Sequence, residues 1–415
     1  MGRFVPKRWG SSFRWLLGSS WSTNFGDGVA MAAAPLLIAS LTRNPFLISL
    51  GALISWAPPM VFSLYAGVLS DRLNRRRIML VANAARLVVL AGLVTMIATG
   101  TITVASALVA LALMGVAEVF ADNTASTLAP MLVPRDDLAL ANSRLQTGFL
   151  TLNQLAGPPL GALLFTAGAA WPFAGQFLLA AAGLVMISRI VLPAHGRENG
   201  STGKSVLHDL REGFLWTVRH AAVRTLVLTI LIFNVTFGAA WSVLVLYSLE
   251  RLGLGSVGFG LLTTIMAVGG LIGTALYGAI TRRFSLGVVM RAGLIIETLT
   301  HLGLALATSA WVAFPIFLVF GAHAFIWGAT SVTVRQRAVP TELQGRVGSV
   351  NTIGVFGGMV VGSLIGGALA SHYGVTAPFW FAFAGSAVFV VALWRQLMHI
   401  AHDDEAPAEV TPSTP

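Results

Sequence analysis

The stretch Gly67-Val68-Leu69-Ser70-Asp71-Arg72-Leu73-Asn74-Arg75-Arg76-Arg77 separates two long apolar runs, at 47–69 and 78–98. Each run has the roughly 20 apolar residues that an α-helix needs to cross the hydrocarbon core of a bilayer. A short, strongly basic loop between two such runs is typical of the cytoplasmic side of a membrane protein, where Lys and Arg accumulate. The stretch therefore predicts two membrane-spanning helices joined by a cytoplasmic loop.

The composition extends this interpretation to the whole chain. Of 415 residues, 56% are hydrophobic and 10% are charged, whereas a soluble domain carries about 25% charged residues. The net charge of +10 would suggest a nucleic-acid partner in a soluble protein. In a membrane protein the same excess follows from its orientation in the bilayer, so we expect no nucleic-acid partner. The absence of Cys excludes disulfides and thiolate metal sites.

Apolar runs of spanning length recur along the sequence and predict an all-α membrane protein with twelve transmembrane helices. The predicted spans are 15–40, 47–69, 78–98, 103–128, 145–168 and 172–193, then 225–248, 257–280, 286–307, 311–333, 347–370 and 376–398. With the N-terminus in the cytoplasm, Lys and Arg fall on the cytoplasmic side except Arg43 and Arg251, and we count Arg86 with the loop Arg72–Arg77. Both termini are therefore expected in the cytoplasm, and the protein in the plasma (inner) membrane of a bacterium.

The predicted helices form two related halves. Gly115 and Gly321 precede the same pattern, which ends in Val133-Pro134 and Val339-Pro340, and both pairs are 206 residues apart. Such an internal repeat predicts two six-helix, pseudo-symmetric halves with a substrate path between them. We expect an N-terminal half at 1–194, a cytoplasmic linker with an amphipathic helix at 195–224, a C-terminal half at 225–400 and a disordered acidic tail at 401–415.

The loop from Gly67 to Arg77 resembles the G-x-x-x-D-R-x-x-R-R signature of the major facilitator superfamily. The resemblance implies that Gly67, Asp71, Arg72 and Arg76 form a gating loop, in which Asp71 holds the N-terminal end of span eleven at Arg346. A carboxylate there is attracted to the positive end of the helix and to the adjacent guanidinium. Alternatively, the run Arg75–Arg77 only anchors the topology and contacts anionic lipid.

Further stretches resemble the enterobactin-exporter and macrolide-efflux branch of this superfamily, which includes drug antiporters. They are Gly26-Asp27-Gly28, the region Val133-Pro134 to Ala141-Asn142, Gly157-Pro158-Pro159-Leu160-Gly161 and Gln344-Gly345-Arg346-Val347. The third stretch is similar to the G-P-x-x-G-G signature of proton-coupled drug antiporters, although Ala162 replaces the final Gly. Gly157, Pro158 and Gly161 are accordingly a predicted helix-bend motif. Alternatively, they only bend the helix and let it pack closely.

Ionisable side chains within predicted spans are functional candidates, because a charge in the bilayer interior is costly. They are Asp27, Glu118, Asp122, Glu297, His301 and His323. The resemblance implies that the first and fourth helices of each half line the cavity, so we select Asp27, Glu118, Asp122 and His323 as candidate proton and cargo sites. Glu118 and Asp122 are one helical turn apart, and two carboxylates so close favour the binding of a proton by one of them. We expect no Arg or Lys within the membrane to neutralise them.

Each of these residues also has a structural interpretation. Asp27 could hydrogen-bond a broken helix, and Asp122 could pair with Arg135 or Arg144. Glu297 and His301 are one turn apart and could satisfy each other. His323 faces the presumed cavity in our prediction, or is simply a hydrogen-bonded buried histidine. Neutral or aromatic candidates for lining the cargo path are Asn24, Asn234, Phe237, Trp241 and Trp327.

The sequence has no P-loop pattern, metal-ligand spacing or nucleophile elbow, so we predict neither an enzyme nor a cofactor or metal site. Our leading hypothesis is a secondary transporter that exports an amphipathic organic compound, of the drug or siderophore type, by proton antiport. Its partners would be the small-molecule substrate, protons and membrane lipids, and we expect a monomer. An importer of a small nutrient, a lipid flippase and a non-transporting membrane sensor are the alternatives.

Overall fold

The computed structural model describes residues 6–192 and 206–396, and this part of the chain is helical throughout apart from its connections. The N-terminal half contains η1 (Lys7–Trp9), α1 (Gly10–Leu41), α2 (Pro45–Arg72), α3 (Arg75–Ala98), α4 (Val104–Ser126), α5 (Ala129–Leu132), η2 (Arg135–Asp137), α6 (Leu138–Gly148), η3 (Phe149–Ala156), α7 (Gly157–Ala167) and α8 (Trp171–Ser188). After the linker helix α9 (Val206–Arg219), the C-terminal half contains α10 (Ala221–Trp241), α11 (Leu244–Leu246), η4 (Tyr247–Arg251), α12 (Ser256–Arg283), α13 (Leu286–Leu306), α14 (Ala310–Ala338), η5 (Thr341–Leu343), α15 (Gln344–Tyr373) and α16 (Ala377–Leu393).

The described residues contain 10 helices that are long and apolar enough to cross a membrane. Two further segments complete the predicted twelve. One is α6, η3 and α7, which continue from residue 138 to 167 with a π-helix in the middle. The other is the shorter apolar helix α16. The twelve-helix, all-α architecture predicted from hydropathy is therefore confirmed.

Local sequence signals explain where these helices begin and end. The side chains of Asn44 and Asn74 accept hydrogen bonds from the first turns of α2 and α3, at Phe46 N and Arg77 N. Such caps satisfy backbone donors that a helix start leaves free. At the other end, α7 and α15 are followed by Gly168 and Gly374 with φ of 155° and 88°. Only glycine adopts these angles readily. The two glycines are 206 residues apart, which is the offset of the repeat, so α7 and α15 end at equivalent positions of the two halves.

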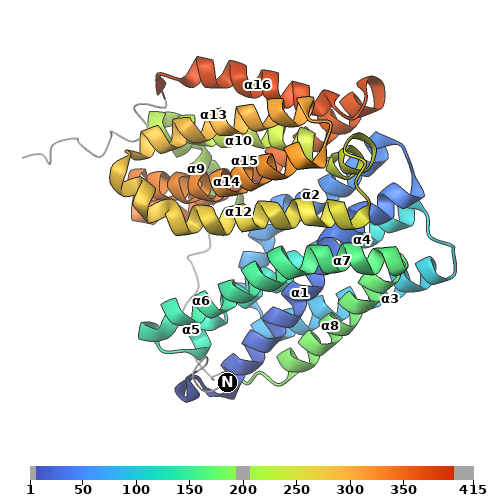
Figure 1. Cartoon of the computed structure of the whole chain (residues 1–415). Coiled ribbons are helices and arrows are strands. Elements are labelled where there is room, and N and C mark those ends of the chain that lie inside the picture. The colour runs from blue at the N-terminus through green and yellow to red at the C-terminus, as the bar shows by residue number, and fades with distance from the viewer. Residues whose placement is uncertain (1–5, 193–205, 397–415) are drawn as a thin grey trace, which may run out of the picture.

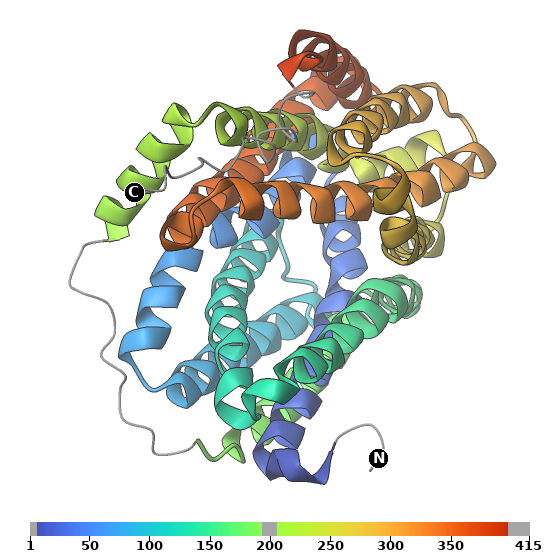
Figure 2. The same ribbon diagram turned by 90° about the vertical axis from the view of Figure 1, so that its left-hand side faces the viewer.

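The two halves form two bundles that converge at one end and diverge at the other (Figure 1). We call the diverging end, where α5, α6 and α9 lie, the linker end; Figure 2 views the molecule from this side. At the opposite end a single buried core combines both halves, with Leu36 and Ala162 from the first and Phe259 and Ala370 from the second. At the linker end, the buried clusters around Trp9 and around Val347 each belong to one half.

Glycines allow the helices to approach one another closely. A Cβ on Gly28 of α1 would lie 2.5 Å from the carbonyl oxygen of Asn153, and one on Gly161 of α7 would lie 2.0 Å from that of Val29. Across the halves, a Cβ on Gly260 of α12 would come within 2.7 Å of Ala162 on α7. Small residues favour helix association in lipid because the backbones can pack against each other. The halves are thus joined through α7 with α12 and through α2 with α15.

The linker was predicted to contain an amphipathic helix, and the residues in that region form α9, which packs against the start of α15. A Cβ on Gly213 would lie 2.6 Å from the carbonyl oxygen of Arg346. The predicted tail at 401–415 lies outside the described residues, as does most of the linker before α9. The proposed domain boundaries remain predictions.

Candidate functional site

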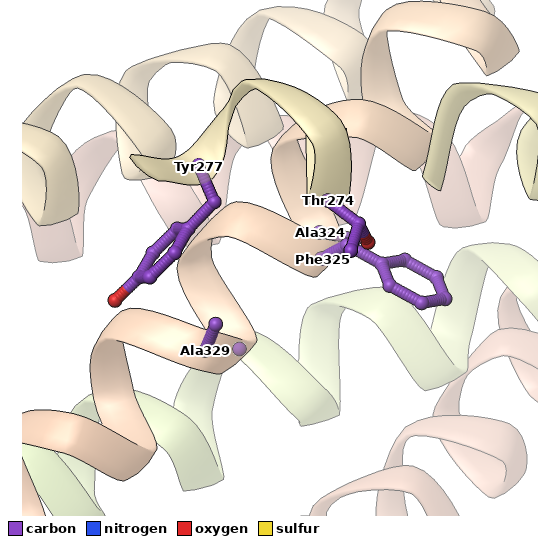
Figure 3. A pocket seen from close by; sticks show the side chains of 6 residues that line it. Thr274, Tyr277, Ala324, Phe325 and Ala329 are labelled. Carbon is purple, nitrogen blue, oxygen red and sulfur yellow. The ribbon is translucent and has the colours of Figure 1, made fainter. Parts of the chain in front are cut away.

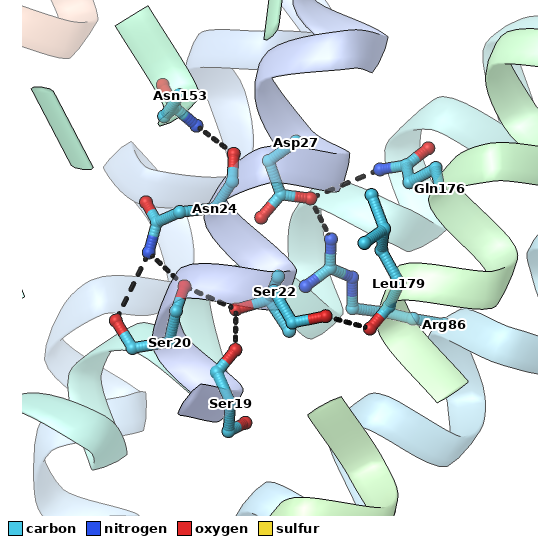
Figure 4. A network of polar contacts seen from close by, with 10 residues as sticks. Ser19, Ser20, Ser22, Asn24, Asp27, Arg86, Asn153, Gln176 and Leu179 are labelled. Carbon is cyan, nitrogen blue, oxygen red and sulfur yellow. Dashed lines mark hydrogen bonds and ion pairs between the residues drawn. The ribbon is translucent and has the colours of Figure 1, made fainter. Parts of the chain in front are cut away.

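A buried ion pair lies at the centre of the N-terminal half (Figure 4). Arg86 of α3 donates a hydrogen bond to Oδ1 of Asp27 on α1, and Nε2 of Gln176 on α8 donates to the same oxygen at 3.1 Å. The side chain of Arg86 is 2% exposed and that of Asp27 is 14% exposed. A buried carboxylate needs such partners because burial removes its water. Three helices are therefore tied together at Asp27.

This pair overturns one prediction. We expected no basic residue within the membrane to neutralise the carboxylates, and we counted Arg86 with the cytoplasmic loop. The structure places Arg86 eleven residues inside α3, buried against Asp27. The signal was present in the sequence, because Arg86 falls within the predicted span 78–98 and an ionisable residue there is a functional candidate. Gln176, in the sixth predicted span, was also missed.

Glu118 and Asp122 of α4 lie one turn apart beside this pair. Glu118 is half-buried and Asp122 is exposed, and both are within electrostatic range of Asp27 and Arg86. Among the described residues of this cluster, three carboxylates thus lie near one guanidinium, that of Arg86. Charges of one sign in a medium of low dielectric repel strongly. The cluster is therefore suited to hold a proton or another cation.

The helix-bend motif follows a π-helical stretch, η3, that ends at Ala156. Within it, Nδ2 of Asn153 donates to the carbonyl oxygen of Asn24 at 3.2 Å, beside the buried ion pair (Figure 4). A Cβ on Gly157 would lie 2.5 Å from the backbone of Gly28. π-helical turns and prolines both interrupt the regular ladder of a helix and bend it. In this structure Gly157 and Gly161 also serve close packing.

The C-terminal half holds a second buried cluster. Oε2 of Glu297 on α13 lies 3.6 Å from Nε2 of His323 on α14, and Oε1 lies 4.0 Å from Nε2 of His301. His301 is fully buried, and neither of its ring nitrogens has a hydrogen-bond partner in the described part of the chain. His323 is 6% exposed and lies beside Glu297, as the alternative of a buried histidine expects, and its role as a proton or cargo site remains a prediction. Glu297 and His301 do lie together, and His323 joins them.

Aromatic candidates gather next to this cluster. The rings of Phe237 and Trp241 on α10 stack at 4.3 Å between centroids, and Trp241 lies 4.7 Å from Phe320 of α14. Trp241 also contacts the His301 ring edge-to-face at 6.2 Å. These side chains pack within the C-terminal half, which is a structural role. A direct role in lining the cargo path remains a prediction for them.

The remaining candidates for lining the path also make contacts within their own half. Asn24 and Asn234 each donate to a carbonyl one turn earlier in their own helix, at 2.7 Å in both cases. Trp327 packs with the buried cluster around Leu294 of α13.

The predicted gating loop is described only in part. The side chains of Asp71 and Arg72 lie outside the described residues, so their contact with α15 remains a prediction. Arg76 donates a hydrogen bond to the carbonyl oxygen of Ser188 at the end of α8. Arg346 at the start of α15 pairs with Glu212 of the linker helix, with Nη1 and Oε1 2.7 Å apart. A Cβ on Gly67 would meet nothing within 4 Å.

Outside the spans, the linker end of the N-terminal half is fixed by Asp137. Its carboxylate accepts hydrogen bonds from Nε of Arg8 at 2.8 Å and from Nε1 of Trp9 at 2.7 Å. These bonds and the charge of Arg8 lower the pKa of Asp137. The described residues contain no group of His, Asp and Glu side chains arranged to hold a metal ion.

Comparison with known sequences identifies relatives over nearly the whole chain. The family described as transmembrane secretion effector, one of the families of the major facilitator superfamily, matches residues 2–414. The multidrug efflux pump Tap of Mycolicibacterium fortuitum is 26% identical over 375 residues, which cover 85% of this chain and 88% of Tap. An uncharacterized MFS-type transporter of Mycobacterium tuberculosis is 31% identical over 125 residues, 29% of this chain and 28% of that protein.

Solved structures of transporters share the fold. The nucleoside transporter NupG superimposes with a TM-score of 0.74 at 12% sequence identity, covering 94% of this chain and 99% of NupG. A bacterial homologue of the iron transporter ferroportin, in an inward-facing state, gives a TM-score of 0.68 at 18% identity, covering 96% and 99% of the two chains. At such identities these structures establish the architecture, while the substrate has to be argued from the site itself.

Proposed function

We propose that this chain exports an amphipathic organic compound in exchange for protons. The chain belongs to the transmembrane secretion effector family of the major facilitator superfamily and is a multi-pass membrane transporter. The similarity to the multidrug efflux pump Tap supports the direction of transport and the broad type of cargo. We place the protein in the bacterial plasma membrane with both termini in the cytoplasm, as the distribution of Lys and Arg predicts.

The observation that carries the proposal is the cluster of Asp27, Glu118 and Asp122 around Arg86. If all three carboxylates were ionised, the cluster would hold two more negative than positive charges in a region of low dielectric. Such a state is costly, so the cluster binds a proton or exchanges it for a cationic group. Arg86 holds Asp27 in place, and Glu118 and Asp122 exchange the proton for the cargo.

The arrangement of the halves fits alternating access, in which two rigid bundles rock about a site between them. The shared core lies opposite the linker end. With the linker end in the cytoplasm, this conformation is inward-facing, and Asp122 is open to the side from which an exporter takes its cargo. Arg346 would then move with the linker helix through its pair with Glu212.

The test uses the purified full chain in liposomes that enclose a pH-sensitive dye, with a proton gradient imposed across the membrane. A panel of amphipathic compounds is added, and we expect at least one to drive proton movement opposite to its own. The double variant Glu118→Gln with Asp122→Asn should lower this exchange at least tenfold. Glu342→Gln, at an exposed loop carboxylate, is the matched control and should leave the exchange unchanged.

Three results would overturn the proposal. The first is that no compound of a broad panel moves protons. The second is that the double variant exchanges protons as the unaltered chain does. The third is that protons move in the same direction as the compound, because a symporter driven by an inward proton gradient would import its substrate.

A further inference from the structure

The linker helix α9 is packed against the protein on one face and uncovered on another. Gly213 is buried, and a Cβ on it would lie 2.6 Å from the carbonyl oxygen of Arg346 at the start of α15. The uncovered face carries Phe214, Leu215 and Val218, which are 56%, 40% and 43% exposed. The helix therefore holds three large apolar side chains away from the core while its backbone touches α15.

Three exposed arginines, Arg211, Arg219 and Arg224, accompany these apolar side chains. Arg211 precedes the three apolar residues by three, four and seven positions, so it lies on the same side of the helix. In sequence α9 contains two carboxylates, Asp209 and Glu212, and the second of them is paired with a guanidinium of α15. The uncovered face is thus both apolar and surrounded by positive charge.

The position of α9 is fixed at the level where the chain enters the membrane. One residue, His220, separates it from α10, which is long and apolar enough to span a bilayer. The rings of His220 and Trp216 stack at 4.8 Å between centroids, and Nη1 of Arg224 donates to the carbonyl oxygen of Val218 at 2.9 Å. These contacts lock the corner between the two helices. Figure 2 shows α9, in light green, at the outer edge of the C-terminal half.

A hollow within the spans differs from this surface in its charge. A pocket of about 500 Å³ lies between α12 and α14, and no side chain that lines it is charged at neutral pH (Figure 3). The lining residues are Thr274, Tyr277, Ala324, Phe325, Gly328 and Ala329. That pocket therefore indicates no charged partner. Apolar side chains beside arginines, as on α9, are instead typical of a helix that lies in the interface of a membrane.

We propose that α9 binds the surface of a membrane that contains anionic phospholipids and thereby fixes the start of α15. The exposed apolar side chains would enter the acyl region, and the arginines would bind phosphate oxygens through charge-assisted hydrogen bonds. The link to α15 is the pair of Glu212 and Arg346, whose Oε1 and Nη1 are 2.7 Å apart, together with the close backbone contact at Gly213. Because α15 also packs against α2, lipid binding at α9 reaches the interface between the halves.

The first experiment asks what covers the exposed face. The chain has no Cys, so a single introduced cysteine can carry a fluorophore without background. Phe214→Cys places the label on the face, and Glu342→Cys, at an exposed loop residue, is the matched control. The purified full chain is placed in nanodiscs of phosphatidylcholine, alone or with phosphatidylglycerol, and quenched by nitroxide lipids or by acrylamide in the water. We expect lipid quenching at Phe214→Cys, stronger with phosphatidylglycerol, and acrylamide quenching at Glu342→Cys.

The second experiment removes the charges. Two arginines near an anionic surface strengthen binding roughly 30-fold together. Arg211→Gln with Arg219→Gln, added to the labelled Phe214→Cys chain, should therefore lower the ratio of lipid to acrylamide quenching at least tenfold in phosphatidylglycerol. Arg282→Gln with Arg283→Gln removes the same charge from exposed positions at the end of α12 and should leave the ratio unchanged.

The third experiment follows the start of α15. Gly345→Cys accepts a spin label, because Gly345 is exposed and a Cβ there would meet nothing within 4 Å. Adding phosphatidylglycerol should slow the motion of this label. Glu212→Ala removes the pair with Arg346 and should remove the slowing.

The inference is overturned if acrylamide quenches the label at Phe214→Cys as it does at Glu342→Cys, or if phosphatidylglycerol has no effect. Equal weakening by the two arginine variants would overturn it as well. Protection from both quenchers would mean that a second copy covers the face, which also contradicts the proposal. Slowing that persists in Glu212→Ala would overturn the link to α15. No measurement here requires a cargo, so the result is independent of the proposed function.

Discussion

Arg86 and Glu297 occupy the same place in the two halves, eleven residues after the first residue of α3 and of α13. Both are buried among neighbouring helices, yet their charges are opposite. Arg86 is paired with the carboxylate of Asp27, whereas Glu297 faces the imidazoles of His301 and His323. An ion pair exists in the second case only when an imidazole is protonated. Both halves thus bury an ionisable side chain at this position of the repeat, but the sign of its charge differs between them.

The largest effect is expected at Arg86, whose ion pair with Asp27 distinguishes the N-terminal half from the C-terminal half. Arg86→Met leaves Asp27 buried without its cation, which costs about 3 kcal/mol of folding free energy. We expect a large drop in the melting temperature of the purified protein and loss of transport. Adding Asp27→Asn removes the orphaned charge and should restore most of the stability. If Arg86→Met alone melts like the unaltered chain, the ion pair does not hold the three helices together.

A smaller effect is expected at the equivalent position of the C-terminal half. Glu297→Gln keeps a hydrogen-bonding side chain beside His323 and leaves no buried charge unpaired, so it should cost only about 1 kcal/mol. Proton-coupled transport in liposomes should be retained, because this cluster is enclosed within its half. Abolished transport with an unchanged melting temperature would instead make Glu297 a coupling residue and the two halves functionally alike.

The smallest effect is expected at the linker end, where Asp137 binds Arg8 and Trp9. Because the folded-state pKa of Asp137 lies below its ordinary value of about 3.9, the stabilisation is fully present above that value and is lost as the pH falls through the folded-state pKa. Asp137→Asn should therefore lower the melting temperature slightly at pH 7. The difference from the unaltered chain should vanish on acidification. A difference that grows as the pH falls would contradict this assignment.

The fold was largely predictable because its signals are local. A span such as 78–98 follows from hydropathy alone, and α3 begins only three residues earlier, at Arg75, directly after the cap Asn74. The spacing of Glu118 and Asp122 likewise fixes their common face, since one helix carries both. Interruptions within spans were less predictable. The π-helix η3 follows no apolar pattern, and the break between α10 and α11 falls inside a continuous apolar run.

The partners within the site could not be predicted in the same way. Asp27 and Arg86 are 59 residues apart in sequence, and their contact depends on how α1 packs against its neighbours. Arg86 lies within the predicted span 78–98, but we counted it with the basic residues of the adjacent cytoplasmic loop. We therefore did not expect it to meet a buried carboxylate. His323 shows the same difficulty, because only packing of α14 on α13 decides that it meets Glu297.

The contact of Gly260 with α7 has a consequence for the speed of transport. At Gly260 itself the α12 backbone meets α7 without a side chain between them, whereas its neighbour Phe259 is buried in the core that both halves share. If the two bundles separate at this end during transport, Phe259 has to leave that core, and the loss of buried apolar area opposes the movement. We therefore expect the packing at this end, as well as the charge chemistry around Arg86, to contribute to the rate of transport.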